Sequence, residues 1–153
     1  TVEFERVAFL RLQNNKLNDV LKGLEKLTQL TWLALSSNQL TSLKGLEKLT
    51  QLKQLNLRAN QLTDVSGLEN LTQLTSLNLD FCQLTELPKG LEKLTQLEFL
   101  RLSHNKLTDV KGLEKLTQLT ILWLDANPDL TKAQIDQLQK ALPKCKIISN
   151  PTK

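Results

Sequence analysis

A unit of 22 or 23 residues, repeated along most of the chain, constrains this sequence more than any other feature. The string Gly-Leu-Glu-Lys-Leu-Thr-Gln-Leu occurs four times, and a fifth copy differs only in Asn70. The five copies begin at Gly23, Gly45, Gly67, Gly90 and Gly112. Each is followed by the pattern L-x-x-L-x-L-x-x-N-x-L, with Cys82 in the Asn position of one copy and Asp129 in the last Leu position of the final copy, and an earlier copy of that pattern starts at Val7. A period of this length predicts a solenoid, in which every unit stacks on the next.

Each unit combines two periodicities. The central x-L-x-L-x alternates with a period of two, which predicts a short strand whose leucines point inward. The back half, for example Leu46 to Leu49, places apolar residues three apart, as in a single 3₁₀ or α turn. One coil cannot bury its leucines alone, so the strands should pair in a parallel sheet. Because the backs are wider than the strand spacing of about 4.8 Å, the sheet should curve with its strands on the concave side.

The repeated pattern covers Val7 to Leu130 and resembles the leucine-rich-repeat family. The unit length and the Gly-Leu-x-x-Leu-Thr-x-Leu back are similar to the bacterial, internalin-like and phosphatase-regulator-like class. This resemblance implies an α/β fold, a leucine-rich-repeat solenoid with a curved parallel sheet and short helical turns on its convex side. We expect one domain over 1–153, in which 1–6 form a partial N-terminal cap, 7–130 form six repeats and 131–153 form a C-terminal cap.

The predicted caps lie where the repeat pattern stops. Thr131 to Gln134 has the sequence of a helix capping box, and the helix should end before Pro143. Its predicted apolar stripe consists of Ala133, Leu138, Ala141 and Leu142. A final strand is expected over 144–148. At the other end, a truncated first coil is expected from Val2, Phe4 and Val7.

A polar row recurs at the turn after the strands. It comprises Asn15, Asn38, Asn60, Asn105 and Asn127. These amides are expected to satisfy backbone groups that each turn leaves open, which is a structural role. Cys82 takes the position in the fourth repeat and should be buried. Cys145 lies some three coils further on, about 14 Å away at the sheet spacing, so no disulfide is expected.

The backs are nearly identical, but the strand positions that point away from the core vary. Five of the six aromatic residues fall there or at the adjacent rim. Exposed Trp, Phe and Arg are typical of recognition surfaces. The predicted partner-binding residues are Phe9, Arg11, Trp32, Asn56, Arg58, Asn78, Asp80, Phe81, Phe99, Arg101, His104, Ile121, Trp123 and Asp125.

Two apolar clusters with a polar centre are expected on this face. In the first, Phe9 and Trp32 are lateral neighbours with Arg11 beside them. The second comprises Phe99, Ile121, Trp123 and Arg101, in which the guanidinium can stack on the indole.

Between the clusters the repeat register makes specific pairings. Arg58 and Asp80 should form a cross-strand ion pair. Phe81 and His104 should meet at the rim.

The sequence predicts a non-catalytic protein-interaction module that binds another protein on the concave face. Aromatic neighbours can also stabilise a sheet by about 0.2–1 kcal/mol per pair without any ligand. The alternatives are a recognition domain cut from a larger bacterial signalling or surface protein, a carbohydrate-binding module that stacks sugars on Trp32 and Trp123, and an engineered or structural repeat scaffold. Self-association through the end strands is a further option.

Catalysis, metal binding and cofactor binding are not expected. His104 is the only histidine, and Cys82 is expected to be buried, so a Cys–His dyad is disfavoured. Structural zinc needs four Cys or His ligands, and the glycines mark repeat backs rather than a phosphate loop.

The charge distribution excludes one class of partner. The repeats to Leu130 balance fifteen basic against fifteen acidic residues, and the whole +4 comes from the C-terminal segment. Nucleic-acid binding is therefore not expected. No run of about 20 apolar residues predicts a membrane span. Unpaired cysteines favour a reducing, cytoplasmic compartment, but the chain opens Thr1-Val2 without a methionine, so we expect processing or a longer parent and leave the compartment open.

Overall fold

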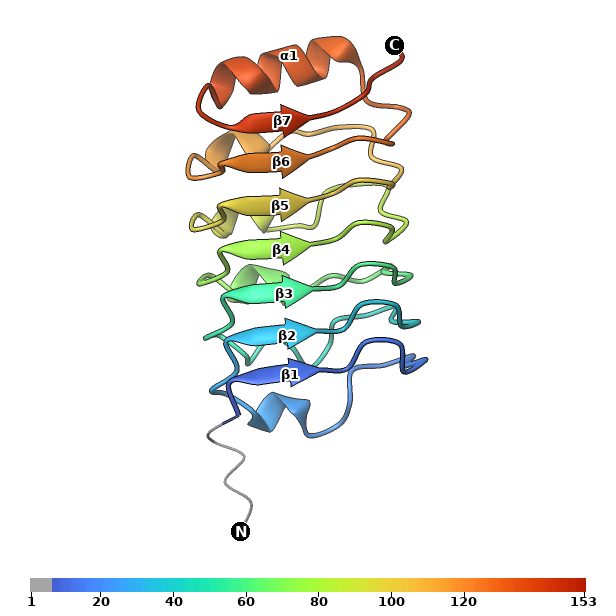
Figure 1. Ribbon diagram of the computed structural model, residues 1–153, viewed down its shortest axis with the longest axis vertical. Helices are drawn as coiled ribbons and strands as arrows, with labels where there is room; N and C mark the ends of the chain where they lie inside the picture. Colours follow the sequence, from blue (N-terminus) through green and yellow to red (C-terminus); the bar gives the residue numbers. More distant parts are fainter. Residues whose placement is uncertain (1–6) are drawn as a thin grey trace.

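The computed structural model describes residues 7–153, so Val2 and Phe4 of the predicted first coil lie outside the described residues. Seven strands form one parallel sheet in chain order (Figure 1). They are β1 (Phe9–Arg11), β2 (Trp32–Ala34), β3 (Gln54–Asn56), β4 (Ser76–Asn78), β5 (Phe99–Arg101), β6 (Ile121–Trp123) and β7 (Lys146–Ile148). Every strand pairs in register with the next, and the central leucines lie side by side from β1 to β6.

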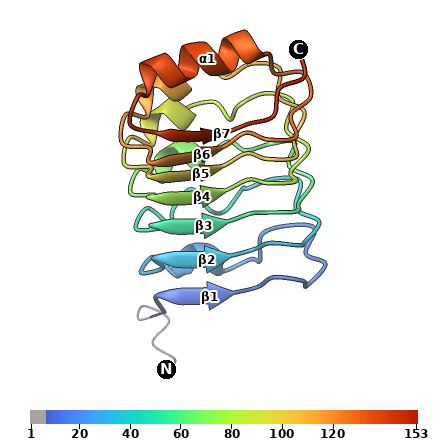
Figure 2. The same ribbon diagram turned by 45° about the horizontal axis from the view of Figure 1, so that its top comes forward.

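The backs of the coils lie behind the sheet (Figure 2). Four of them form a 3₁₀ helix: η2 (Leu24–Lys26), η3 (Leu68–Asn70), η4 (Leu91–Lys93) and η5 (Leu113–Lys115). The predicted helical turn at 46–49 is present as separate turns rather than as a helix. The result is the expected leucine-rich-repeat solenoid with its curved parallel sheet. The turns are short because leucines three residues apart must all reach the same core.

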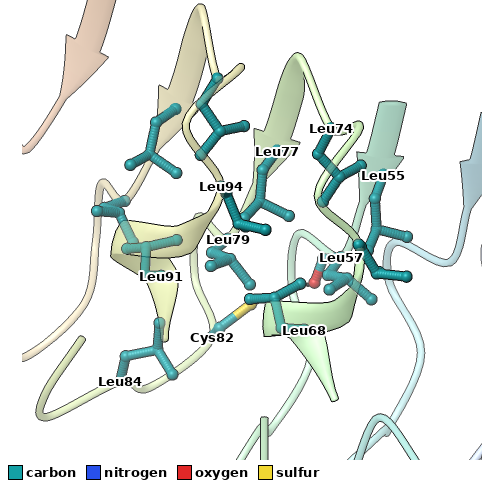
Figure 3. Close-up of a cluster of buried hydrophobic side chains, with 14 of the residues drawn as sticks. Leu55, Leu57, Leu68, Leu74, Leu77, Leu79, Cys82, Leu84, Leu91 and Leu94 are labelled. Carbon is teal, nitrogen blue, oxygen red and sulfur yellow. Dashed lines mark hydrogen bonds between the residues drawn. The ribbon is translucent and has the colours of Figure 1, made fainter. Parts of the chain in front are cut away.

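The core is one continuous column of leucines between the sheet and the backs. Leu33, Leu55 and Leu77 from successive strands are at most 2% exposed. Figure 3 shows Leu68 and Leu91 of the backs facing the strand leucines, with the Cys82 thiol among them. Each coil buries its leucines only against its neighbours, so the stack is stabilised coil by coil.

The C-terminal cap is α1 (Lys132–Ala141), which lies over the last coil (Figure 1). Thr131 Oγ1 accepts from the Gln134 backbone, and the Gln134 side chain accepts from the Thr131 backbone, which confirms the capping box. The predicted apolar stripe is partly wrong, because Ala133 and Ala141 are exposed. Ile135, Leu138 and Leu142 are buried instead. The larger side chains occupy the positions three and four residues apart that meet the core, and the two alanines lie beside this stripe.

The closing strand is shorter than predicted. β7 begins at Lys146, two residues later than expected, and pairs with β6. Cys145 lies just before it and is buried. Cys82 is also buried, and both cysteines are free, as the repeat spacing predicted.

Candidate partner-binding face

The asparagine row fixes the turns that follow the strands. Asn105 donates from Nδ2 to the carbonyls of Leu79 and Leu102, at 2.9 and 3.0 Å. Its Oδ1 accepts from the backbone N–H groups of Cys82 and Leu84, at 3.1 and 2.9 Å. Asn38, Asn60 and Asn127 join adjacent coils in a similar way. The row is therefore structural, as predicted, and it holds each strand end in a defined position on the sheet.

Beside this row the chain turns in the left-handed region. The residues before each Asn or Cys are Asn14, Ser37, Ala59, Phe81, His104 and Ala126, with φ between 55° and 60°. A non-glycine residue in this region costs about 1–2 kcal/mol, so the coil geometry must impose it. The repeated turn places Phe81 and His104 at equivalent positions of adjacent coils.

We use the term sheet face for the solvent-facing surface of β1–β6 together with the residues that follow each strand up to the asparagine row. At its first strands, Phe9 pairs laterally with Trp32, as predicted. Arg11 lies over the Trp32 ring, with Cζ 5.4 Å from the ring centroid. These side chains and Gln54 line a shallow hollow. Phe9 is 70% exposed.

The second cluster also forms. Phe99 pairs laterally with Ile121, and Arg101 pairs with Trp123. The Arg101 guanidinium lies over the indole, 4.6 Å from its centroid. Phe99 remains 40% exposed, whereas Ile121 is half-buried.

The predicted Arg58–Asp80 ion pair is wrong. Asp80 pairs with Arg101 of the next coil, whose Nε donates to Oδ2 at 2.8 Å. The other oxygen, Oδ1, accepts from the Ser103 backbone N–H at 2.8 Å. This backbone bond draws the carboxylate toward the next coil. Asp80 is only 2% exposed, so it positions Arg101 and offers little surface to a partner.

Arg58 has a different neighbour. Its Cζ lies 4.8 Å from the centroid of the Phe81 ring. Phe81 stacks in turn on His104, with centroids 4.1 Å apart and ring planes 10° apart, which confirms the predicted rim contact. Arg58, Phe81 and His104 thus form a continuous stack across three coils.

The remaining predicted residues belong to the polar centre. Asn56 and Asn78 are half-buried, and each accepts a hydrogen bond from the backbone two residues later. Asp125 accepts a hydrogen bond from the Ser103 hydroxyl. The structure therefore brings the fourteen predicted residues to one side of the sheet in several separate groups, with Asp80 buried among them. Gln54, which lines the hollow, and Ser103, which donates to Asp125, were not among the predicted residues.

The titratable and metal-ligating side chains near this surface are few. Burial raises the pKa of the Cys82 thiol to about 11, and His104 faces Phe81 rather than a nucleophile. Within residues 7–153, no group of three or more His, Cys, Asp or Glu side chains is arranged to hold a metal ion. Over the same residues, no helix is both long and apolar enough to cross a membrane.

Solved structures show where this architecture recurs. An internalin (InlF) from Listeria monocytogenes matches 96% of this chain with a TM-score of 0.86 and 28% identity. A leucine-rich-repeat protein of Leptospira interrogans matches 94% with a TM-score of 0.86 and 33% identity. Internalin C2 from Listeria monocytogenes matches 96% with a TM-score of 0.84 and 30% identity. The chain spans 43%, 37% and 64% of these three proteins, respectively.

The sequence itself matches a family model described as leucine-rich repeats in two copies. The matches cover residues 28–70, 50–93, 72–113 and 95–140, which together exceed half of the chain. No curated protein sequence matches significantly. Proteins with such repeats are generally protein-interaction modules. The chain belongs to the leucine-rich-repeat family.

Proposed function

We propose that this protein is a non-catalytic module that binds another protein on the sheet face. One observation carries the proposal. Among residues 7–153, four large apolar side chains are well exposed, and three of them, Phe9, Phe81 and Phe99, lie on this face. Aromatic side chains and arginine are enriched in protein interfaces and provide much of their binding energy.

The arrangement suits binding because its parts are already ordered. Arg11 and Arg101 each lie against an indole before any partner arrives. The strands below them are joined in register by backbone hydrogen bonds. A preformed surface loses little conformational entropy on association. The aromatic clusters would supply affinity, and the amides of Asn56 and Asn78 would set the register of the partner.

Sheet stabilisation alone accounts poorly for this surface. A cross-strand aromatic contact stabilises a sheet through the area that the two rings bury against each other. Phe9 leaves 70% of its surface in water, and Phe99 leaves 40%. This exposed apolar area stabilises the protein only when a partner covers it and removes it from water.

Carbohydrate binding has less support than protein binding. A sugar ring would stack on a free indole face, but a guanidinium already covers one face of Trp32 and of Trp123. A protein partner can use the guanidinium and the ring edge together. The same role would serve the chain within a larger bacterial surface or signalling protein.

The test compares affinity capture by three proteins. The first is the wild type, and the second replaces Arg11, Trp32, Arg101 and Trp123 with alanine. The third is a matched control on the backs, which also removes two cations and two uncharged side chains. Its substitutions are Lys48→Ala, Gln51→Ala, Lys93→Ala and Gln96→Ala, all at exposed positions.

Circular dichroism and thermal unfolding must first show that all three proteins fold. A protein captured by the wild type is then purified, and its Kd is measured for each variant. We expect the sheet-face variant to lose binding and the control to retain it. Equal binding by the sheet-face variant, or loss in the control alone, would reject the sheet face as the binding surface.

A further inference from the structure

The charges on the sheet face are unevenly divided between its two halves. In the β1–β3 half, the charged positions are Arg11 and Arg58, and no acidic residue occupies this part of the face. In the β4–β6 half, Arg101 is paired with Asp80, and Asp125 adds a second carboxylate. The repeats balance their charges overall, so the positive excess is a local property of the first half.

The two arginines of the first half have no anionic partner within residues 7–153. All ion pairs among these residues involve other groups. For Arg58 the reason is geometric, because the adjacent carboxylate of Asp80 is committed to Arg101 and to the Ser103 backbone. Its charge is therefore available to a ligand.

Both guanidinium groups are nevertheless held in place. Arg11 lies over Trp32 and Arg58 lies over Phe81, with Cζ 5.4 and 4.8 Å from the ring centroids. A guanidinium that lies over a ring makes no hydrogen bond to it through its outer N–H groups, so these donors stay free for a ligand. These donors match a carboxylate, which can accept two parallel hydrogen bonds. Such preorganised donors lose little side-chain entropy when they bind.

An apolar feature lies next to these cations. Phe9, Arg11, Trp32 and Gln54 line the shallow hollow at the start of the sheet. Phe9 is the most exposed large apolar side chain among the described residues. A ligand for this half should therefore combine negative charge with an apolar side chain.

We infer that the β1–β3 half of the sheet face binds an acidic segment of the partner, an inference that rests on the proposed function. The carboxylates of this segment pair with Arg11 and Arg58, and an apolar side chain that precedes the first carboxylate covers Phe9 and Trp32. Arg11 is in register with Asn56, so Arg58 stands two coils away across the sheet and two residues further along, which is about 12 Å in all. An extended chain advances about 3.3 Å per residue and points alternate side chains to opposite faces, so acidic residues four apart lie on one face, about 13 Å apart, and match the two cations.

The test uses a fluorescein-labelled peptide with the sequence Phe-Ser-Glu-Ser-Ser-Ser-Glu, whose two acidic residues are four apart and lie, with the Phe, on one face of an extended chain. Fluorescence anisotropy measures its binding to the folded wild type, to the double variant Arg11→Gln and Arg58→Gln, and to the control Lys48→Gln and Lys93→Gln. The control removes the same charge from the backs. We expect the arginine variant to bind about 10-fold more weakly, because it loses two charge-assisted contacts, and the control to bind as the wild type does. Binding should also weaken in high salt.

Four results would overturn the inference. They are absence of binding at millimolar peptide, equal binding by the arginine variant, equal binding of a peptide with Gln in place of Glu, and tighter binding of a single-stranded oligonucleotide that depends on the same arginines. A partner that is lost on substitution of Arg101 and Trp123, but is indifferent to Arg11 and Arg58, would leave the proposed function intact and reject only the acidic segment.

Discussion

Arg101 reaches back across one coil to Asp80 and donates Nε to the buried carboxylate at 2.8 Å. The same guanidinium lies over Trp123 of the following coil. One side chain therefore joins three coils on the sheet face. Asp80 is the anchor of this arrangement, because it also accepts from the Ser103 backbone.

Replacement of Asp80 by alanine should lower the free energy of unfolding by about 2 kcal/mol, since it leaves the buried Ser103 N–H unsatisfied. Asp80→Asn should cost less, because it keeps an acceptor for that N–H. Urea denaturation measures both. The control is Asp129→Ala, which removes an exposed ion pair with Lys153 and should cost under about 1 kcal/mol. An Asp80→Ala loss no larger than that of the control would contradict the anchoring role.

The members of the asparagine row should contribute unequally to the free energy of unfolding. Asn105 makes bonds to five backbone groups of two coils, so Asn105→Ala should cost about 2–4 kcal/mol. The Asn15 side chain is exposed and, among residues 7–153, donates only to the Gln13 carbonyl, so Asn15→Ala should cost under about 1 kcal/mol. Chemical denaturation of the two variants tests this difference. Equal losses would mean that the inter-coil bonds contribute little.

Alanine substitutions at Gly67 and Gly23 separate the cost of backbone strain from the cost of a steric contact. The φ angles of the two glycines are nearly equal, at 95° and 96°, so alanine at either position should cost about 1–2 kcal/mol in left-handed strain. A Cβ at Gly67 would lie 3.0 Å from Glu47 Cβ, whereas a Cβ at Gly23 meets nothing within 4 Å. Gly67→Ala should therefore cost about 1 kcal/mol more. The measurement is the urea midpoint of each variant, and a larger loss at Gly23 would refute the packing argument.

The buried Cys82 thiol should make stability fall at alkaline pH. Burial raises its folded pKa to about 11, above the unfolded value of about 8.5. Between these values the unfolded thiol is deprotonated while the folded thiol keeps its proton, so the unfolded state is favoured as the pH rises. The contribution of this group to stability is complete below about pH 8.5 and should drop by roughly 3 kcal/mol by pH 11.

Urea denaturation between pH 7 and 11 measures this loss. The comparison protein is Cys82→Asn, which places the residue of the equivalent coils at this position and has no titrating thiol. Its stability should fall less steeply over the same range. Parallel pH profiles for the two proteins would show that Cys82 does not contribute.

The sequence by itself determined the coil. A fixed period places every inward leucine and every turn Asn at the same point of its unit, so the strands, their register, the core and the set of side chains on the sheet face follow from spacing alone. The stacks of Arg101 on Trp123 and of Phe81 on His104 could also be predicted, since each pair joins lateral neighbours with complementary chemistry.

Only the tertiary structure decided which of two neighbouring coils a side chain contacts when both are at the same distance. Asp80 stands between the coils of Arg58 and of Ser103, and the strand spacing on its two sides is the same. The Ser103 backbone N–H turned it toward the later coil, which left Arg58 to stack on Phe81. Likewise Ile135 packs into the core of the last coil, whereas Ala133 and Ala141 stay exposed. The repeat period determines where the Cα of each side chain lies. The orientation of the side chain depends on the hydrogen-bond donors and the space that residues of neighbouring coils provide.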